Sequence, residues 1–167
     1  VCLSLCAQYP RKDAIMGIHY AFKSDEAGDA NAVVWIPGAN MYVTAMSGGG
    51  EMPMEGFSAL GKFLWTETAG FDARGLWYNP KRKRVESNSS GNDGWYFQQF
   101  DENGDLVSTP TKFLTGNHQP DPESNLSFTG KAVVGLNNDD IYYYHPTNGK
   151  FLKSFSLDKP KDADFET

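Results

Sequence analysis

The sequence predicts an all-β fold built from repeated four-stranded antiparallel units, and three observations support this. First, a phrase made of a strand end, a polar turn closed by glycine and a new apolar strand occurs three times, with the glycine at Gly61, Gly104 and Gly149. The glycines are 43 and 45 residues apart, a period typical of repeat architectures. Second, 17 Gly and 9 Pro residues supply many turn positions. Third, no stretch keeps a helical hydrophobic period behind a cap for three turns.

The first unit is expected at residues 31–68. Residues 32–36 form a continuous apolar run, which is typical of a strand buried on both faces. A turn at 37–40 leads to a second strand at 41–46, and the glycine-rich segment 47–50 forms a loop. A poorer strand at 54–59 reaches the turn closed by Gly61, and residues 62–66 complete the unit.

The second unit is expected at residues 74–115. Its first strand, at 75–78, contains Trp77, which follows Trp35 by 42 residues. The basic segment 81–84 is interpreted as a solvated hairpin turn, and strands are expected at 84–88 and 95–100. The turn at 101–104 should open a fourth strand at 105–109, which Pro110 interrupts and residues 111–115 extend beyond a bulge.

The third unit is expected at residues 125–157, with strands at 126–128, 132–136, 141–145 and 150–157. The last of these alternates with period two. His145 occupies the place that Phe57 and Phe100 hold in the other repeats, so we expect a structural role for it. The three consecutive tyrosines at 142–144 are expected to pack between units.

Units of four strands and about 42 to 50 residues have the size of a β-propeller blade. The chain resembles the secreted bacterial β-propellers of the broad NHL, YVTN and lactonase-like class. The residues that carry the resemblance are the turn at 78–83, Tyr-Asn-Pro-Lys-Arg-Lys, and the phrase at 146–152, Pro-Thr-Asn-Gly-Lys-Phe-Leu. It covers residues 31–157 and implies a ring of four to eight blades.

The sequence supplies three blades, or four if the lead-in at residues 9–30, with its possible strand at 14–22, contributes one. An open array of blades would leave apolar faces and strand edges uncovered. We therefore expect a partial propeller, closed either by the remaining blades of a longer chain or by further copies of this one. The polar residues 158–167 would then be a tail or a linker to a missing blade.

Residues 1–8 resemble the end of a signal peptide with cleavage near Ala7, which predicts a secreted or periplasmic protein. Two alternatives stay open: a lipid anchor at Cys6, which Leu5 disfavours because a small residue is normally needed there, and an ordinary N-terminal strand. Removal of this segment would take away Cys2 and Cys6, leaving no disulfide or thiolate.

Charge and hydropathy exclude some partners. The net charge is −6 and the isoelectric point is near 5.0, whereas nucleic acids and anionic membranes bind basic surfaces. No apolar run approaches the length of a transmembrane span.

The loops that join successive blades, and those between second and third strands, share one face in a propeller, and such loops commonly carry function. We call this end of the molecule the loop face. It should hold residues 47–51, 72–74, 88–93, 117–121 and 137–140. The first functional hypothesis is non-enzymatic binding of a protein, glycan or small ligand here, without a cofactor. The candidate residues are Asp72, Arg74, Asn92, Asp93, His118 and Gln119.

Arg74 has the strongest claim among these candidates, because the segment 70–75 places its charge beside a buried strand. Its guanidinium could clamp a carboxylate or phosphate through two parallel hydrogen bonds. Two plainer alternatives remain. Arg74 can simply pair with Asp72, and Asp, Asn and Gly are common in these loops because they form turns.

The resemblance also implies a second hypothesis, a calcium-dependent lactonase-like hydrolase. In that case Glu51 or Glu67, together with Asn92 and Asp121, would bind a calcium ion that polarises a lactone carbonyl. No catalytic residue is assigned, because no nucleophile is paired with a base and no G-x-S-x-G motif occurs. The three histidines at 19, 118 and 145 lack the spacing of a zinc site.

Overall fold

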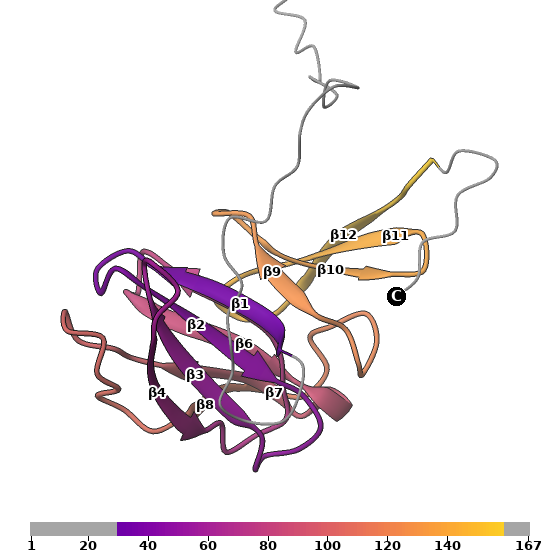
Figure 1. The fold of residues 1–167 in the computed structure, drawn as a ribbon. Coiled ribbons are helices and arrows are strands. Elements are labelled where there is room, and N and C mark those ends of the chain that lie inside the picture. Colours follow the sequence, from indigo (N-terminus) through magenta and orange to yellow (C-terminus); the bar gives the residue numbers. More distant parts are fainter. Residues whose placement is uncertain (1–29, 159–167) are drawn as a thin grey trace, which may run out of the picture.

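The computed structural model describes residues 30–158, which form three four-stranded antiparallel sheets (Figure 1). The first blade contains β1 (Ala30–Ile36), β2 (Met41–Met46), β3 (Pro53–Ser58) and β4 (Phe63–Thr68). The second contains β5 (Ala73–Asn79), β6 (Arg84–Ser89), β7 (Gly94–Gln98) and β8 (Thr111–Thr115). The third contains β9 (Leu126–Phe128), β10 (Val133–Asn137), β11 (Asp140–Tyr144) and β12 (Phe151–Ser156).

In each blade the strands pair in sequence order, and one short 3-10 turn, η1 (Ser90–Asn92), lies between β6 and β7. The predicted all-β fold of four-stranded blades is therefore confirmed. Among residues 30–158, no helix has the length and apolarity to cross a membrane. Several predictions lie outside the described residues: the signal-peptide remnant with Cys2 and Cys6, the lead-in strand with His19, and the polar tail beyond residue 158.

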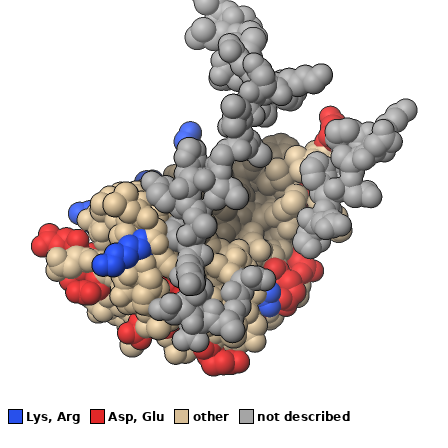
Figure 2. Space-filling model, in the orientation of Figure 1, with Lys and Arg blue, Asp and Glu red and all other residues tan. Residues whose placement is uncertain are grey.

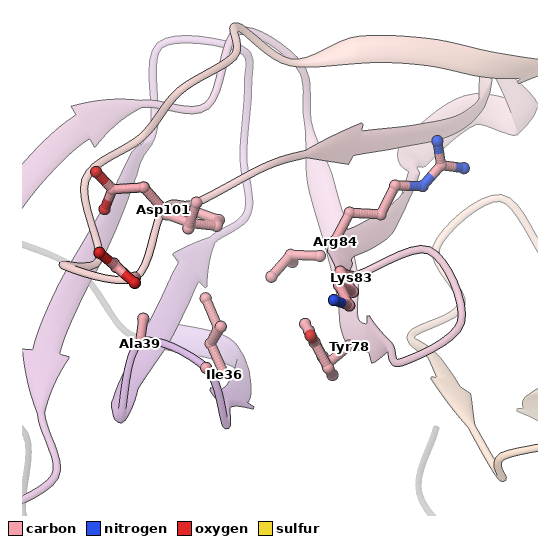
Figure 3. A pocket seen from close by; sticks show the side chains of 10 residues that line it. Ile36, Ala39, Tyr78, Lys83, Arg84 and Asp101 are labelled. Carbon is pink, nitrogen blue, oxygen red and sulfur yellow. The ribbon is translucent and has the colours of Figure 1, made fainter.

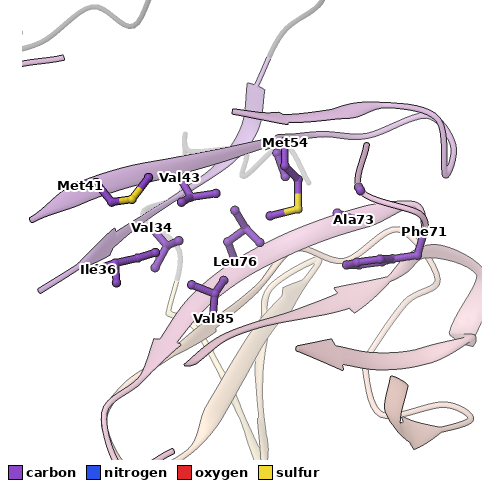
Figure 4. Packing of buried hydrophobic residues seen from close by; sticks show 11 residues of the cluster. Val34, Ile36, Met41, Val43, Met54, Phe71, Ala73, Leu76 and Val85 are labelled. Carbon is purple, nitrogen blue, oxygen red and sulfur yellow. The ribbon is translucent and has the colours of Figure 1, made fainter. Parts of the chain in front are cut away.

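The blades pack face to face through two apolar clusters. β1 contacts β5 and β5 contacts β9, so the first strands of the three blades lie side by side. Between the first two blades, the buried apolar side chains of β1 and β2 pack against Leu76 of β5 and Val85 of β6 (Figure 4). Between the second and third blades, Trp77 and Trp95 pack with Leu126 and Tyr144. Period-two alternation along each strand places these side chains on the facing surfaces.

The three copies of the repeated phrase form closely similar turns. In the first, the amide of Ser58 donates to the carbonyl of Lys62, and Gly61 donates to Ser58. The second copy has the same pattern from Asp101 to Asp105, with Gly104 donating to Asp101.

The third turn is one residue longer, because its corresponding position is Pro146, which has no amide hydrogen. His145 takes over the role by donating to the carbonyl of Lys150. Its side chain is exposed, and its Nδ1 accepts from the amide of Thr147 at 3.2 Å. All three glycines have positive φ, from 64° to 87°, which explains why glycine stands at each of these positions.

One predicted strand is wrong. Residues 105–109 form no strand, and Phe100 and Leu106 are joined only by an isolated bridge. The fourth strand of the second blade is β8, so residues 99–110 form a long connection that we call the excursion. Its Phe100 stacks on Trp65 of β4 with ring centroids 5.8 Å apart, and Trp65 Nε1 donates to the carbonyl of Gly104 at 3.2 Å. Phe100 and Gly104 therefore hold the excursion against the neighbouring blade, whereas Val107 of the predicted strand is 59% exposed.

Candidate ligand-binding site

Arg74 joins several loops of the loop face. Its Nη2 lies 3.2 Å from Asp72 Oδ2 and also forms an ion pair with Glu123, while the Arg74 side chain is only 18% exposed. Glu123 accepts a hydrogen bond from Ser90 Oγ at 2.8 Å, and Asp72 Oδ1 accepts from the amide of Gly48 at 3.0 Å. The pairing of Arg74 with Asp72 is present as expected, and Glu123 is an additional partner from the loop between the second and third blades.

Gln119 is a structural residue rather than an exposed ligand contact. It is 4% exposed, and its Oε1 accepts from Asn88 Nδ2 at 2.7 Å while its Nε2 donates to the carbonyl of Pro122 at 2.9 Å. Asn88 is fully buried, and its Oδ1 accepts from the amides of Gly75 and Leu126. This pair of amides therefore ties β5, β6 and β9 to the loop that precedes β9.

His118 is also engaged within the protein. Its Nδ1 lies 3.1 Å from the carbonyl oxygen of Gly149, and its Nε2 lies 3.1 Å from that of Thr115. A Cβ at Gly149 would come within 2.5 Å of His118 Cγ, so glycine permits this close approach. The ring packs edge-on against Trp95 at 6.0 Å. His118 thus links the end of β8 to the turn between β11 and β12 instead of presenting a nitrogen to a ligand.

Asp93 binds neighbours on its own blade. It accepts hydrogen bonds from Lys112 Nζ at 2.6 Å and from the Tyr96 hydroxyl at 2.5 Å. The hydrogen bond from Lys112, and secondly that from Tyr96, lowers the pKa of Asp93. Burial, followed by the hydrogen bond to Asp93, raises the pKa of Tyr96. Asn92 belongs to η1, immediately before Asp93. Of the predicted residues, Asp72 and Arg74 pair with each other, whereas Asp93, His118 and Gln119 contact other partners.

A cavity of about 650 Å³ does open on the loop face. It lies between the loop that precedes β9 and the turn between β10 and β11. Its lining combines carboxylates, a hydroxyl and amides with one apolar side chain, and consists of Asp121, Glu123, Ser124, Asn125, Leu136, Asn137 and Asn138. We call it the loop-face cavity. Glu123 therefore lines this cavity and also forms the ion pair with Arg74.

The main chain of the loop-face cavity is held by local hydrogen bonds. Asp121 Oδ1 accepts from the amide of Glu123 at 2.9 Å, and the Asp121 amide donates to Ser124 Oγ at 3.1 Å. On the opposite wall, Asn138 has a φ of 51°, a left-handed conformation that asparagine tolerates.

In the view of Figure 2, acidic side chains form several separate groups around the molecule and basic ones are fewer.

The calcium hypothesis gains no support from this geometry. Within residues 30–158, no three His, Cys, Asp or Glu side chains lie close enough together to hold a metal ion. Glu51 and Glu67 are exposed on the first blade, whereas Asp121 lies in the loop before β9.

Sequence reasoning identified part of the cavity and missed the rest. Asp121, Asn137 and Asn138 fall within the predicted loops, but Glu123, Ser124 and Asn125 were not singled out. The segment Asp-Pro-Glu-Ser at 121–124 carried a usable signal, because Asp side chains that precede Pro commonly organise turns through their own backbone. That signal predicts a turn but not what the turn faces.

No family model and no curated protein matches this sequence. Solved structures do match. A functionally unknown protein from Desulfotomaculum acetoxidans is 19% identical with a TM-score of 0.56, and the match covers 81% of this chain and 44% of that one. Glutaminyl cyclase from Myxococcus xanthus is 11% identical with a TM-score of 0.54, covering 77% of this chain and 51% of that one.

The chain therefore spans about half the length of these two structures. Identities this low establish likeness of fold alone. Together with the three four-stranded antiparallel sheets, they show that the chain has the structural resemblance to β-propeller proteins that its repeats predicted.

Proposed function

We propose that the protein is a non-enzymatic binding scaffold whose loop-face cavity takes a glycan or another polyhydroxylated ligand. The observation that carries this proposal is the lining of the cavity. Its volume, about 650 Å³, falls within the ordinary range of small-ligand sites. Its position between two loops carried by rigid blades is also typical of binding sites.

The chemistry of the lining favours hydroxyl groups over other ligands. The carboxylates of Asp121 and Glu123 accept hydrogen bonds, whereas the amides of Asn125, Asn137 and Asn138 both donate and accept. Neighbouring hydroxyls of a sugar need this mixture, since each one donates and accepts. Leu136 adds an apolar contact for the C–H face of a ring. An anionic ligand fits less well because two carboxylates line the same space.

We would test this with a glycan microarray probed by the labelled 167-residue chain, followed by calorimetric titration of the best-bound glycan. Asn138→Gly removes an amide from the cavity while keeping a residue that tolerates its φ of 51°. We expect it to weaken binding about fivefold to tenfold, the contribution of one or two hydrogen bonds.

Asn40→Gly is the matched control. Asn40 has a φ of 52° in the turn between β1 and β2 and does not line the loop-face cavity. This variant should bind the glycan as the unaltered chain does. A microarray without any bound glycan, or equal binding by the Asn138→Gly variant, would contradict the proposal.

A further inference from the structure

A second, smaller cavity of about 170 Å³ lies at the opposite end of the blades from the loop face. It opens between the β1–β2 turn, the β5–β6 turn and the excursion (Figure 3). Its apolar lining includes Ile36, Tyr78, Val85 and Phe100. It shares no residue with the loop-face cavity, and we call it the turn pocket.

Charged residues of opposite sign stand on opposite sides of the turn pocket. Lys83 belongs to the β5–β6 turn, whereas Asp101 and Glu102 belong to the excursion. Figure 3 shows Asp101 and Lys83 across the opening from each other, with the Lys83 nitrogen directed toward the space between them. The pocket therefore combines an apolar floor with a dipolar rim.

The backbone at Lys83 indicates that its side chain has a role. The turns at residues 37–40 and 80–83 correspond, since each begins with Pro and ends with a residue in the left-handed region. In the first blade this residue is Asn40, which suits that conformation. In the second it is Lys83, with a φ of 50°, although lysine rarely adopts it. Backbone strain of this kind is concentrated at functional sites.

The two arginines that flank Lys83 are paired within the protein. Arg82 Nη1 and Arg84 Nε lie 2.9 and 2.7 Å from Glu86 Oε1, so both guanidinium groups are paired with the same buried carboxylate. Lys83 is exposed, and among the described residues it takes part in no ion pair. Lys83 is thus the basic residue that remains available at the rim of the turn pocket.

We propose that the turn pocket binds a small aromatic zwitterion, namely an α-amino acid with one aromatic ring in its side chain. A cavity of about 150 Å³ accommodates benzene in another protein, so 170 Å³ is sufficient for one ring. The ring would pack against Tyr78 and Phe100, where aromatic contacts are favourable. The ligand carboxylate would then lie at Lys83 and its ammonium near Glu102 and Asp101, whose Oδ1 also accepts hydrogen bonds from the amides of Asn103 and Asp105.

The test is calorimetric titration of the 167-residue chain with L-phenylalanine. Benzoate, which lacks the ammonium, and phenethylamine, which lacks the carboxylate, are titrated in parallel. We expect phenylalanine to bind more tightly than either analogue. NMR shifts on binding should be confined to residues near 36–39, 78–85 and 100–102.

Lys83→Asn separates binding from folding. It should weaken phenylalanine binding about tenfold or more, the scale of a lost charge-assisted hydrogen bond. It should also raise the melting temperature, because asparagine adopts the left-handed conformation more readily than lysine. Lys81→Asn changes an exposed lysine of the same turn that does not line the pocket, and it should leave binding unchanged.

The absence of saturable phenylalanine binding by the unaltered chain would overturn the proposal. Equal binding by the Lys83→Asn variant would do the same, as would benzoate binding as tightly as phenylalanine. None of these results bears on the loop-face cavity, which is tested with glycans.

Discussion

At the scale of single residues, strand β6 buries polar side chains to an unusual degree. Glu86 and Asn88 lie on the same side of the strand, and both are fully buried. Glu86 accepts hydrogen bonds from Trp77 Nε1, from Asn79 Nδ2, and from Arg82 of the preceding turn and Arg84 at the start of β6. A buried carboxylate is tolerated only with such partners, because desolvating an unpaired charge is highly unfavourable. The hydrophilic sequence of β6 therefore belongs to the interior.

Tyr144 leads to a prediction on pH dependence. Burial, and secondly the charge of Tyr142, raises the pKa of Tyr144 from 10.0 to about 12. The folded state thus keeps this proton where the unfolded state has lost it. Its contribution to stability is complete below pH 10 and declines as the pH rises toward 12, by about 2 to 3 kcal/mol in total.

Urea denaturation at a series of alkaline pH values would measure this loss. Tyr144→Phe should show a smaller decline in the free energy of unfolding than the unaltered chain over the same window. Tyr143→Phe changes a tyrosine on the other face of β11 and should keep the full decline. Identical curves for the two variants would contradict the assignment to Tyr144.

At the scale of elements, the excursion at residues 99–110 is part of the contact between the first two blades. Phe100 belongs to the apolar cluster between these blades and stacks on Trp65, as described above. Gly104 at its turn lies against Met41 of β2, which is 1% exposed. A connection that looks like a surface hairpin in the sequence therefore covers the edge of the neighbouring blade's core.

Two glycines with the same backbone conformation allow this contact to be measured. Gly104 and Gly130 both have a φ of 87°. A Cβ at Gly104 would lie 2.5 Å from Met41 Sδ, whereas a Cβ at Gly130 would meet nothing within 4 Å. Gly130→Ala should destabilise the protein by about 1 kcal/mol through backbone strain alone. Gly104→Ala should cost roughly 1 to 3 kcal/mol more, because it also displaces a buried side chain.

Urea denaturation of both variants gives the difference between the two free energies of unfolding. If both variants lost the same free energy of unfolding, Gly104 would not be in close contact with Met41 of β2, and the described packing of the excursion would be wrong.

At the scale of the whole molecule, stability depends on close approach between the first strands of the blades. Gly75 of β5 faces the backbone of β9, where a Cβ would lie 2.1 Å from the carbonyl oxygen of Leu126. Backbone cannot move aside as a flexible side chain can. Gly75→Ala should therefore lower the free energy of unfolding by about 3 kcal/mol or more.

The same variant should loosen the third blade first. Hydrogen exchange of the β10 and β11 amides is expected to accelerate more than that of β2 and β3. Gly38→Ala is the control, since a Cβ there meets nothing within 4 Å and its φ is not positive, so we expect a change within about 0.5 kcal/mol. Uniform acceleration across all three blades would show that they unfold as one unit.

The third blade also exposes apolar side chains on the face directed away from the second. Phe155 is 49% exposed and pairs with the half-buried Ile141 across the sheet. Such a face is typical of a surface that packs against another element. It agrees with a match that covers only about half of the two longer solved chains.

The sequence by itself determined the strands and their turns. Hairpins depend on neighbours in the chain: a glycine with positive φ at residues 61, 104 and 149, a proline that shifts one turn by a residue, and apolar alternation between them. These signals are local, so they can be recognised without knowing how the blades pack. The exception is residues 105–109, which form no strand: Leu106 makes only an isolated bridge to Phe100, and Val107 is 59% exposed.

Only the tertiary structure decided which loop residues meet. Arg74 pairs with Glu123, and Asn88 with Gln119, across 49 and 31 residues of sequence. His118 and Gln119 looked available in the sequence but are used to join blades. The reason is physical. The same polar side chain in a loop can hydrogen-bond a ligand or the backbone of the next blade, and the way the blades pack decides which of the two it contacts.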